Sequence, residues 1–329
     1  MKFFKIFLLF VPVLFFSCND SSNSSEDNTN NTVYEYREMM RDFVKEISNY
    51  IKGKKQDFIV IGQNGIELFT EDGTEKSHIR YDYLNALDGV SQEGLFYGYD
   101  DFDKKTDEKV SKHLQKLLLI AKDENKPVLI TDYCDDEEKI NDSYQKNKNL
   151  GFISFQADSL DLDKIPDYPP YPWDENPDNI SILSGAKNYL YLLDFHKFSS
   201  KDELLNTLKN TNYDVLIIDA FWDTYEEFSI DDIQSLKTKA NGGRRLVIAY
   251  LSIGEAEDNR WYWQEEWNSN LPDWIKDYQE WEGNYPVEFW NNQWKDIVYT
   301  YIDKIINNGF DGVFLDKIDI YEFFEEYHE

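Results

Sequence analysis

The chain has 329 residues with 34 Lys or Arg against 64 Asp or Glu, so its formal net charge is −30. This acidity argues against nucleic acid as a partner, because nucleic-acid binding requires basic surface that displaces counterions. Solubility is the ordinary explanation of such acidity, and a cationic ligand is the more specific one. The chain has only two cysteines, Cys18 and Cys134, so no disulfide framework supports the fold.

The N-terminus has the pattern of a signal peptide over residues 1–18. Its apolar core, residues 6–16, is too short to cross a bilayer, which takes about 20 residues. The segment ends on FFSC, which resembles the cleavage box of bacterial lipoproteins, where the cysteine becomes the lipid-carrying first residue. We therefore expect a cell-envelope lipoprotein, on the outer surface or facing the periplasm, that is anchored to the membrane through Cys18. An ordinary cleaved signal peptide is the alternative. Residues 19–32 are polar and predict a disordered tether.

Residues 33–329 alternate between two kinds of pattern. An amphipathic helix is predicted first, over Tyr34–Lys52. Eight short apolar runs then predict buried strands: Phe58–Ile61, Leu87–Val90, Val128–Ile130, Phe152–Phe155, Tyr189–Leu193, Val215–Ile218, Leu246–Leu251 and Val313–Leu315. Helical patterns separate most of them: Lys109–Lys122, Glu137–Lys148, Lys201–Lys209, Ile230–Ala240 and Gln293–Asn307.

This alternation, without hairpin signals, predicts an α/β fold with a parallel sheet and helices outside it. Eight such units in about 300 residues fit one domain, a (β/α)8 TIM barrel over residues 33–329. A doubly wound open sheet is the alternative, although no GxGxxG follows any predicted strand. The chain ends soon after its last strand, so we expect the N-terminal helix to close the ring between the eighth and first strands.

A polar residue follows or closes each predicted strand. In a barrel these residues meet at the C-terminal rim, where active sites of this fold lie. Any one of them alone is more simply explained as a helix cap. Six carboxylates and two amides together predict an acidic cleft. The eight residues are Asn64, Glu93, Asp132, Gln156, Asp194, Asp219, Glu255 and Asp316.

The loop after the seventh strand is rich in aromatic and charged residues. Seven of the nine tryptophans lie in or just after it: Trp261, Trp263, Trp267, Trp274, Trp281, Trp290 and Trp294. Some of them must pack in the core. A rim loop that combines aromatic rings with carboxylates is nevertheless typical of a sugar site, because rings stack on sugars while carboxylates bind hydroxyls or amines. We expect the substrate to be bound by Asn64, Asp132, Asp194, Asp219, Glu255, Glu257, Arg260, Trp222 and Trp261.

Other chemistries find little support in the sequence. The four histidines show neither HxH nor HExxH spacing, so no zinc site is predicted. GxSxG and P-loop motifs are missing, and Cys134 fits an inert, partly buried thiol better than a nucleophile. We therefore expect neither a metal nor a cofactor.

Three segments, Ala249–Trp263, Gly283–Trp294 and Gly309–Phe324, resemble glycoside hydrolase family 114. That family of barrel proteins includes endo-α-1,4-polygalactosaminidases and many uncharacterised extracellular proteins. Val60–Leu68 and Leu87–Tyr99 look like two further family segments, which usually follow the GFDG segment and here precede it. The resemblance therefore implies a circularly permuted barrel.

The resemblance also implies a catalytic pair, Asp316 and Glu93. An apolar setting around Glu93 favours it as the acid/base, which leaves Asp316 as the nucleophile or base. Two such carboxylates suffice for glycoside hydrolysis, and their separation decides between retention and inversion. The family usually has an apolar residue or Asn where this chain has Lys317, so the substrate can differ from the best-known one.

We therefore expect an exported, monomeric glycoside hydrolase that acts within an aminosugar-containing polysaccharide. An acidic cleft suits the cationic amines of a partly deacetylated polymer. A non-catalytic surface lipoprotein that binds glycans with the same barrel is the main alternative, and a purely structural barrel is a weaker one.

Overall fold

The computed structural model describes residues 27–327. The predicted signal peptide, Cys18 and the first part of the predicted tether lie outside the described residues. The helix α1 begins at Asp27 and so includes residues 27–32, which the composition placed in the tether. None of the helices described here is long and apolar enough to cross a membrane.

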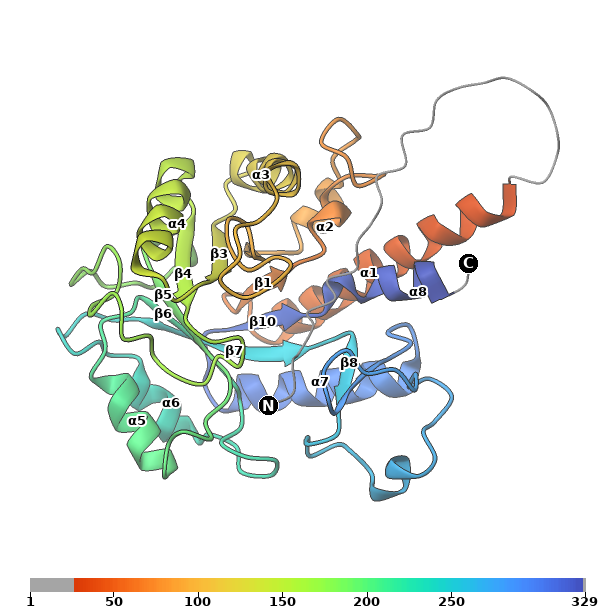
Figure 1. Cartoon of the computed structure of the whole chain (residues 1–329). Coiled ribbons are helices and arrows are strands. Elements are labelled where there is room, and N and C mark those ends of the chain that lie inside the picture. Colours follow the sequence, from red (N-terminus) through yellow and green to blue (C-terminus); the bar gives the residue numbers. More distant parts are fainter. Residues whose placement is uncertain (1–26, 328–329) are drawn as a thin grey trace.

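Eight parallel strands form one sheet in the order β4-β3-β2-β1-β10-β7-β6-β5, and β4 lies beside β5 (Figure 1). The sheet is therefore a nearly closed barrel, which confirms the predicted fold class over the doubly wound sheet. All eight predicted apolar runs contribute a strand. The strands are β1 (Ile59–Gln63), β2 (Gly89–Glu93), β3 (Val128–Tyr133), β4 (Ile153–Ala157), β5 (Tyr189–Leu192), β6 (Val215–Ile218), β7 (Leu246–Ser252) and β10 (Gly312–Asp316).

Helices cover the outside of the barrel. They are α1 (Asp27–Lys54), α2 (Tyr81–Leu84), α3 (Glu108–Asp123), α4 (Glu137–Leu150), α5 (Lys201–Lys209), α6 (Ile230–Leu236), α7 (Asn292–Asn307) and α8 (Tyr321–Tyr327). Four short 3₁₀ turns are η1 (Ile66–Phe69), η2 (Leu183–Gly185), η3 (Glu265–Asn268) and η4 (Ile318–Ile320). Side-chain caps start several helices, because Asp107, Asp136 and Ser200 each accept a backbone N–H of the first turn.

Two connections differ from the predicted pattern. The helix expected over Ile230–Ala240 ends at Leu236, and the chain then pairs Thr238 with Arg244 in an antiparallel bridge. The long connection after β7 contains a two-stranded antiparallel ribbon, β8 (Glu255–Glu257) with β9 (Asn284–Pro286). Its strands are too short to give a periodic signal, so the sequence did not predict it.

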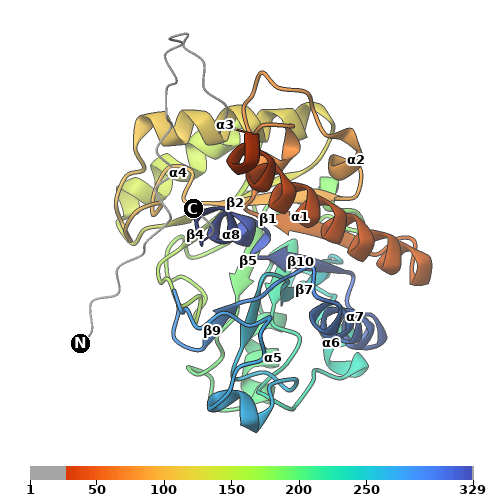
Figure 2. The ribbon, with the colours of Figure 1, turned by 90° about the vertical axis from the view of Figure 1, so that its right-hand side faces the viewer.

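The ring closes between the eighth and first barrel strands, as predicted. Strand β10 pairs with β1 in parallel register, with Ile59 opposite Gly312. Helix α1 contacts α7 on one side and α2 on the other, and therefore fills the place of the missing helix. Its apolar face is fully buried at Met40, Phe43, Val44, Ile47 and Ile51. Figures 1 and 2 both show α1 beside α8, where Arg37 Nε lies 2.8 Å from Glu325 Oε1.

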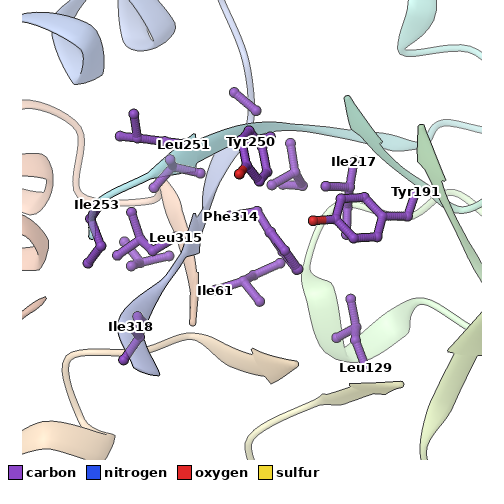
Figure 3. Packing of buried hydrophobic residues seen from close by; sticks show 14 of the residues in the cluster. Ile61, Leu129, Tyr191, Ile217, Tyr250, Leu251, Ile253, Phe314, Leu315 and Ile318 are labelled. Carbon is purple, nitrogen blue, oxygen red and sulfur yellow. The ribbon is translucent and has the colours of Figure 1, made fainter. Parts of the chain in front are cut away.

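The middle of the barrel is a packed core rather than a channel. Figure 3 shows side chains from six strands converging there: Ile61, Leu129, Tyr191, Ile217, Tyr250 and Phe314. The Tyr191 and Phe314 rings lie 5.1 Å apart between their centroids. The polar groups at the C-terminal ends of the strands lie above this apolar core.

Candidate active site

A cavity of about 820 Å³ opens at the C-terminal ends of the barrel strands. It brings together eight of the eleven predicted catalytic and substrate-binding residues: Asn64, Glu93, Asp194, Asp219, Trp222, Glu257, Arg260 and Asp316. The other three, Asp132, Glu255 and Trp261, are not among its lining residues. The ends of the barrel strands therefore bring these eight residues to one cavity.

The cavity is strongly acidic. Eleven carboxylates line it: Glu67, Glu93, Asp161, Asp194, Asp219, Asp223, Glu257, Glu280, Asp316, Asp319 and Glu322. The Lys and Arg side chains that line it are Arg260 and Lys317. Carboxylates therefore far outnumber Lys and Arg side chains around this cavity.

Glu93 ends β2 and is held by two neighbouring strands. The Tyr133 hydroxyl at the end of β3 donates to Glu93 Oε1. From the end of β1, Asn64 Nδ2 donates to Glu93 Oε2 at 3.0 Å, and Asn64 Oδ1 accepts from the Glu93 backbone N–H at 3.1 Å. Asn64 has a φ of 57°, in the left-handed region that non-glycine residues enter only at a cost. The Glu93 side chain therefore has a fixed orientation.

Asp316 ends β10, on the other side of β1 from Glu93. The Tyr250 hydroxyl from β7 donates to Asp316 Oδ2 at 2.9 Å. Burial, and next the charge of Glu93, raise the pKa of Asp316 to about 7, while Lys317 acts in the opposite direction. Asp316 is therefore a carboxyl that can hold a proton near neutral pH while lying within electrostatic reach of a second carboxyl.

Lys317 follows Asp316 in a left-handed conformation, with a φ of 59°. Its ammonium group lies 3.3 Å from Glu255 Oε1 and 3.2 Å from Glu280 Oε2. Burial alone would lower the pKa of Lys317, but Glu255 and Glu280 outweigh it and hold that pKa well above its usual value. Glu255 is only 1% exposed and is not among the lining residues, so it holds Lys317 from outside the cavity lining.

Arg260 links two of the predicted binding residues. Its guanidinium makes two hydrogen bonds to Glu257, at 2.6 and 3.0 Å, and lies 2.5 Å from Asp219 Oδ2. All three side chains are nearly buried, with at most 12% of each exposed. Burial raises the pKa of Asp219, although Arg260 opposes that shift. The triad forms a rigid, charged wall of the cavity.

Asp132 lies behind the site rather than in it. It is fully buried and accepts from the backbone N–H of Phe96 at 2.9 Å and from the Ser143 hydroxyl. Side chains alternate along a strand, and Tyr133 points into the site, so Asp132 points outward to α4. Three tyrosines that line the cavity, Tyr133, Tyr191 and Tyr250, were not predicted. The alternation of side chains near the ends of their strands was a usable signal for them.

Most tryptophans of the seventh-strand loop pack against one another. Edge-to-face contacts join Trp263 to Trp267 at 5.3 Å and Trp267 to Trp274 at 5.5 Å between ring centroids. Trp261 lies edge-on to Tyr301, with Lys304 Nζ 5.0 Å from its ring centroid. Among the described residues, Trp281 and Trp222 are the tryptophans that line the cavity. Trp222 stacks on Phe195, which also lines the cavity. The two ring centroids lie 6.0 Å apart, and the interplanar angle is 5°.

A metal site was not predicted. Within residues 27–327, no group of three or more His, Cys, Asp or Glu side chains is arranged to hold a metal ion. Cys134 is buried, and burial raises the pKa of its thiol, which disfavours the reactive thiolate.

Comparison with known proteins gives a family model and three relatives. Residues 195–328 match the model of glycoside-hydrolase family GH114. An uncharacterized protein of Methanocaldococcus jannaschii is 39% identical over 178 residues, which are 53% of this chain and 49% of that protein. An uncharacterized protein of Thermotoga maritima is 38% identical over 122 residues, 36% of each chain. One of Deinococcus radiodurans is 34% identical over 119 residues, 36% of this chain and 37% of the relative.

The chain thus spans half or less of the length of each of these relatives. The family match includes Asp219, Arg260 and Asp316, whereas Asn64 and Glu93 come before it in the chain. Residues 195–328, which include five of the eight predicted residues that line this cavity, resemble glycoside hydrolase family GH114.

Proposed function

We propose that the protein is a glycoside hydrolase that cuts within an aminosugar-containing polysaccharide, with Asp316 and Glu93 as its reacting carboxyls. The observation that carries the proposal is their placement. Both line one cavity at the C-terminal end of a barrel, on strands that flank β1. Each also accepts a hydrogen bond from a tyrosine hydroxyl.

The environments of the two carboxyls support a division of roles. A pKa of about 7 keeps Asp316 partly protonated at neutral pH, as a proton donor requires. Glu93 accepts hydrogen bonds from the Tyr133 hydroxyl and from the Asn64 amide, which orient its carboxylate in the cavity. We therefore assign Asp316 as the general acid and Glu93 as the nucleophile or base, the reverse of the order expected from the sequence.

In this mechanism the Asp316 proton moves to the glycosidic oxygen as the bond from that oxygen to the anomeric carbon breaks. The Glu93 carboxylate either attacks the anomeric carbon or takes a proton from an attacking water. The Tyr133 hydroxyl and the Asn64 amide hold Glu93 in place, so little reorganisation accompanies the reaction.

The surroundings of the pair support a cationic sugar as the substrate unit. Eleven carboxylates attract free ammonium groups, and the stacked Phe195 and Trp222 rings supply an apolar surface on which a sugar ring can pack. We also propose that the protein is exported, carries lipid on Cys18 and has a circularly permuted family order. The pairing of β10 with β1 and the contact between α1 and α8 are compatible with such a permutation.

The proposal is tested by the appearance of reducing ends when the purified protein meets partly deacetylated polygalactosamine, chitosan and a neutral polysaccharide. We expect reducing ends from an aminosugar polymer, and their loss in Glu93→Gln and Asp316→Asn. Binding of the same polymers is measured in parallel by calorimetry. Binding without any reducing ends would overturn the hydrolase and favour the glycan-binding lipoprotein instead.

A further inference from the structure

A second hollow of about 430 Å³ adjoins the cavity that contains Asp316 and Glu93. We call it the outer hollow, and it is lined by Phe102, Asp158, Ser159, Leu160, Asp161, Trp281 and Glu282. Leu160, Asp161 and Trp281 line both spaces. The outer hollow and the cavity are therefore adjacent, and these three residues form their common wall.

Three separate rim loops build the outer hollow. Phe102 comes from the connection after β2, residues 158–161 follow β4 directly, and Trp281 and Glu282 precede β9 in the seventh-strand loop. The seventh-strand loop thus reaches across the barrel mouth to the loops of β2 and β4. Trp281 is the residue of this loop that lines both the outer hollow and the cavity that contains Asp316 and Glu93.

The lining has the chemistry of a sugar site with a positive ligand. Phe102 and Trp281 contribute aromatic rings, and Asp158, Asp161 and Glu282 contribute carboxylates. No Lys, Arg or His is among the residues that line this hollow in the described chain. Asp158 already pairs with Lys164 at 2.8 Å, so Asp161 and Glu282 are the carboxylates that a ligand would meet.

We propose that the outer hollow is a further binding subsite for aminosugar units of the same polysaccharide chain, beyond the unit that is cleaved. This inference rests on the proposed function and extends it. A ring that packs on Phe102 and Trp281 would present its ammonium group to Asp161 or Glu282. Because the subsite acts only on substrates long enough to reach it, it determines how affinity and cleavage position depend on chain length.

The test uses the full chain with Asp316→Asn, which allows binding to be measured without turnover. Aminosugar oligomers of increasing length are titrated by calorimetry. We expect affinity to rise once an oligomer is long enough to enter the outer hollow. Phe102→Ala or Glu282→Gln should reduce affinity for long oligomers about tenfold, which corresponds to about 1.4 kcal/mol. Affinity for the shortest bound oligomer should stay unchanged.

Two control variants match these changes outside both hollows. Tyr171→Ala removes an aromatic ring, 68% exposed, from the connection between β4 and β5, which also supplies residues 158–161 of the outer hollow. Glu265→Gln removes an exposed charge from the seventh-strand loop. Both should bind long oligomers as the Asp316→Asn protein does. In chains with Asp316 intact, Phe102→Ala and Glu282→Gln should change the lengths of the products.

Three results separate the two proposals. Weaker binding of long oligomers alone, with the controls unaffected, supports the subsite. If the protein cleaves the polymer while Phe102→Ala and Glu282→Gln bind long oligomers like their controls, the subsite is wrong and the hydrolase stands. If the unmodified protein neither binds nor cleaves any aminosugar polymer, both proposals fall. Unfolding curves of all variants show whether each one is folded.

Discussion

Gly254 packs so closely on Lys317 that a methyl group on the glycine would lie 2.3 Å from the lysine carbonyl oxygen. The same methyl group would lie 2.5 Å from Ile320 Cγ2. Gly254 connects β7 to β8, and Lys317 begins the turn that leaves β10 directly after Asp316. The glycine thus fixes the course of the chain beside Asp316.

We expect Gly254→Ala to lower the free energy of unfolding by about 1–3 kcal/mol, because the backbone around Lys317 must shift to admit the methyl group. Hydrolysis should fall as well, since Asp316 shifts with that backbone. Urea unfolding and reducing-end assays measure the two effects. The control is Gly53→Ala in α1, where a methyl group would meet nothing within 4 Å. Equal stability of the two variants would contradict the argument.

The raised pKa of Asp316 makes stability depend on pH. Burial raises that pKa from 3.8 to about 7, so the folded state binds the proton more tightly than the unfolded state. The stabilisation from this proton is complete below about pH 4 and is lost as the pH rises through 7. Asp316→Asn should therefore raise the unfolding temperature more at pH 8 than at pH 5.

A substitution of Asp319 distinguishes this effect on stability from an effect on catalysis. Its pKa is also raised to about 7, mainly by burial, but it is not assigned to the reacting pair. Asp319→Asn should show the same pH-dependent gain in unfolding temperature while its rate still declines above pH 7. That decline reports the loss of the Asp316 proton. A parent rate that stays constant between pH 6 and 9 would rule out Asp316 as the acid.

Arg260 provides a test of the buried charges. Arg260→Met leaves the Asp219 and Glu257 carboxylates uncompensated, so unfolding free energy should fall by about 3–5 kcal/mol. Lys112→Met is the matched control, because Lys112 pairs with Glu108 on the exposed face of α3. It should cause no measurable change. Urea unfolding compares the two, and a similarly small effect in both would show that the buried triad contributes little.

The barrel was predictable because its strands are buried on both faces and read as apolar runs. Which strand-end residues reach the site depends on the alternation of side chains, and a one-residue uncertainty in a strand end reverses that alternation. At the end of β3, this is why Asp132 was predicted in the site although Tyr133 occupies that position. Glu93 and Asp316 are the last residues of their own strands and point inward.

The role of the tryptophans could not be predicted for a different reason. Composition places them in one loop, but the antiparallel ribbon of β8 and β9 decides which rings pack together. Trp263, Trp267 and Trp274 stabilise the loop itself. Trp281, on the far part of the loop, borders the cavity. Which tryptophans pack and which line the cavity depends on contacts between residues distant in sequence. Hydrophobic periodicity gives no information about such contacts.

The lipid anchor remains a prediction from the FFSC segment, which lies outside the described residues. Cys18→Ala removes the only thiol in that segment, so it should release the protein from the membrane fraction or stall its processing. Fractionation followed by immunoblotting measures this. Cys134→Ala is the control, because Cys134 is buried in the barrel and should not affect fractionation. Equal membrane retention of the Cys18→Ala variant and the parent would exclude the lipid.

Asn64 was expected to bind substrate, but its contacts indicate that it positions Glu93. Its amide makes hydrogen bonds to both the side chain and the backbone N–H of Glu93. Asn64→Gly removes these bonds while the glycine adopts the left-handed backbone without strain. We expect kcat to fall by about 10²-fold, the usual cost of a misplaced reacting group, with KM nearly unchanged.

Asn125→Gly is the matched control for this change. Asn125 has a φ of 60° and is exposed after α3, far from the cavity lining, so the same substitution there relieves the same kind of strain. Its activity should equal that of the parent. Asn64→Gly should also unfold more easily than Asn125→Gly by about 1–3 kcal/mol, because two hydrogen bonds are lost. If KM rises while kcat holds, Asn64 contacts the substrate directly, as the sequence predicts, and its hydrogen bonds to Glu93 are not needed for turnover.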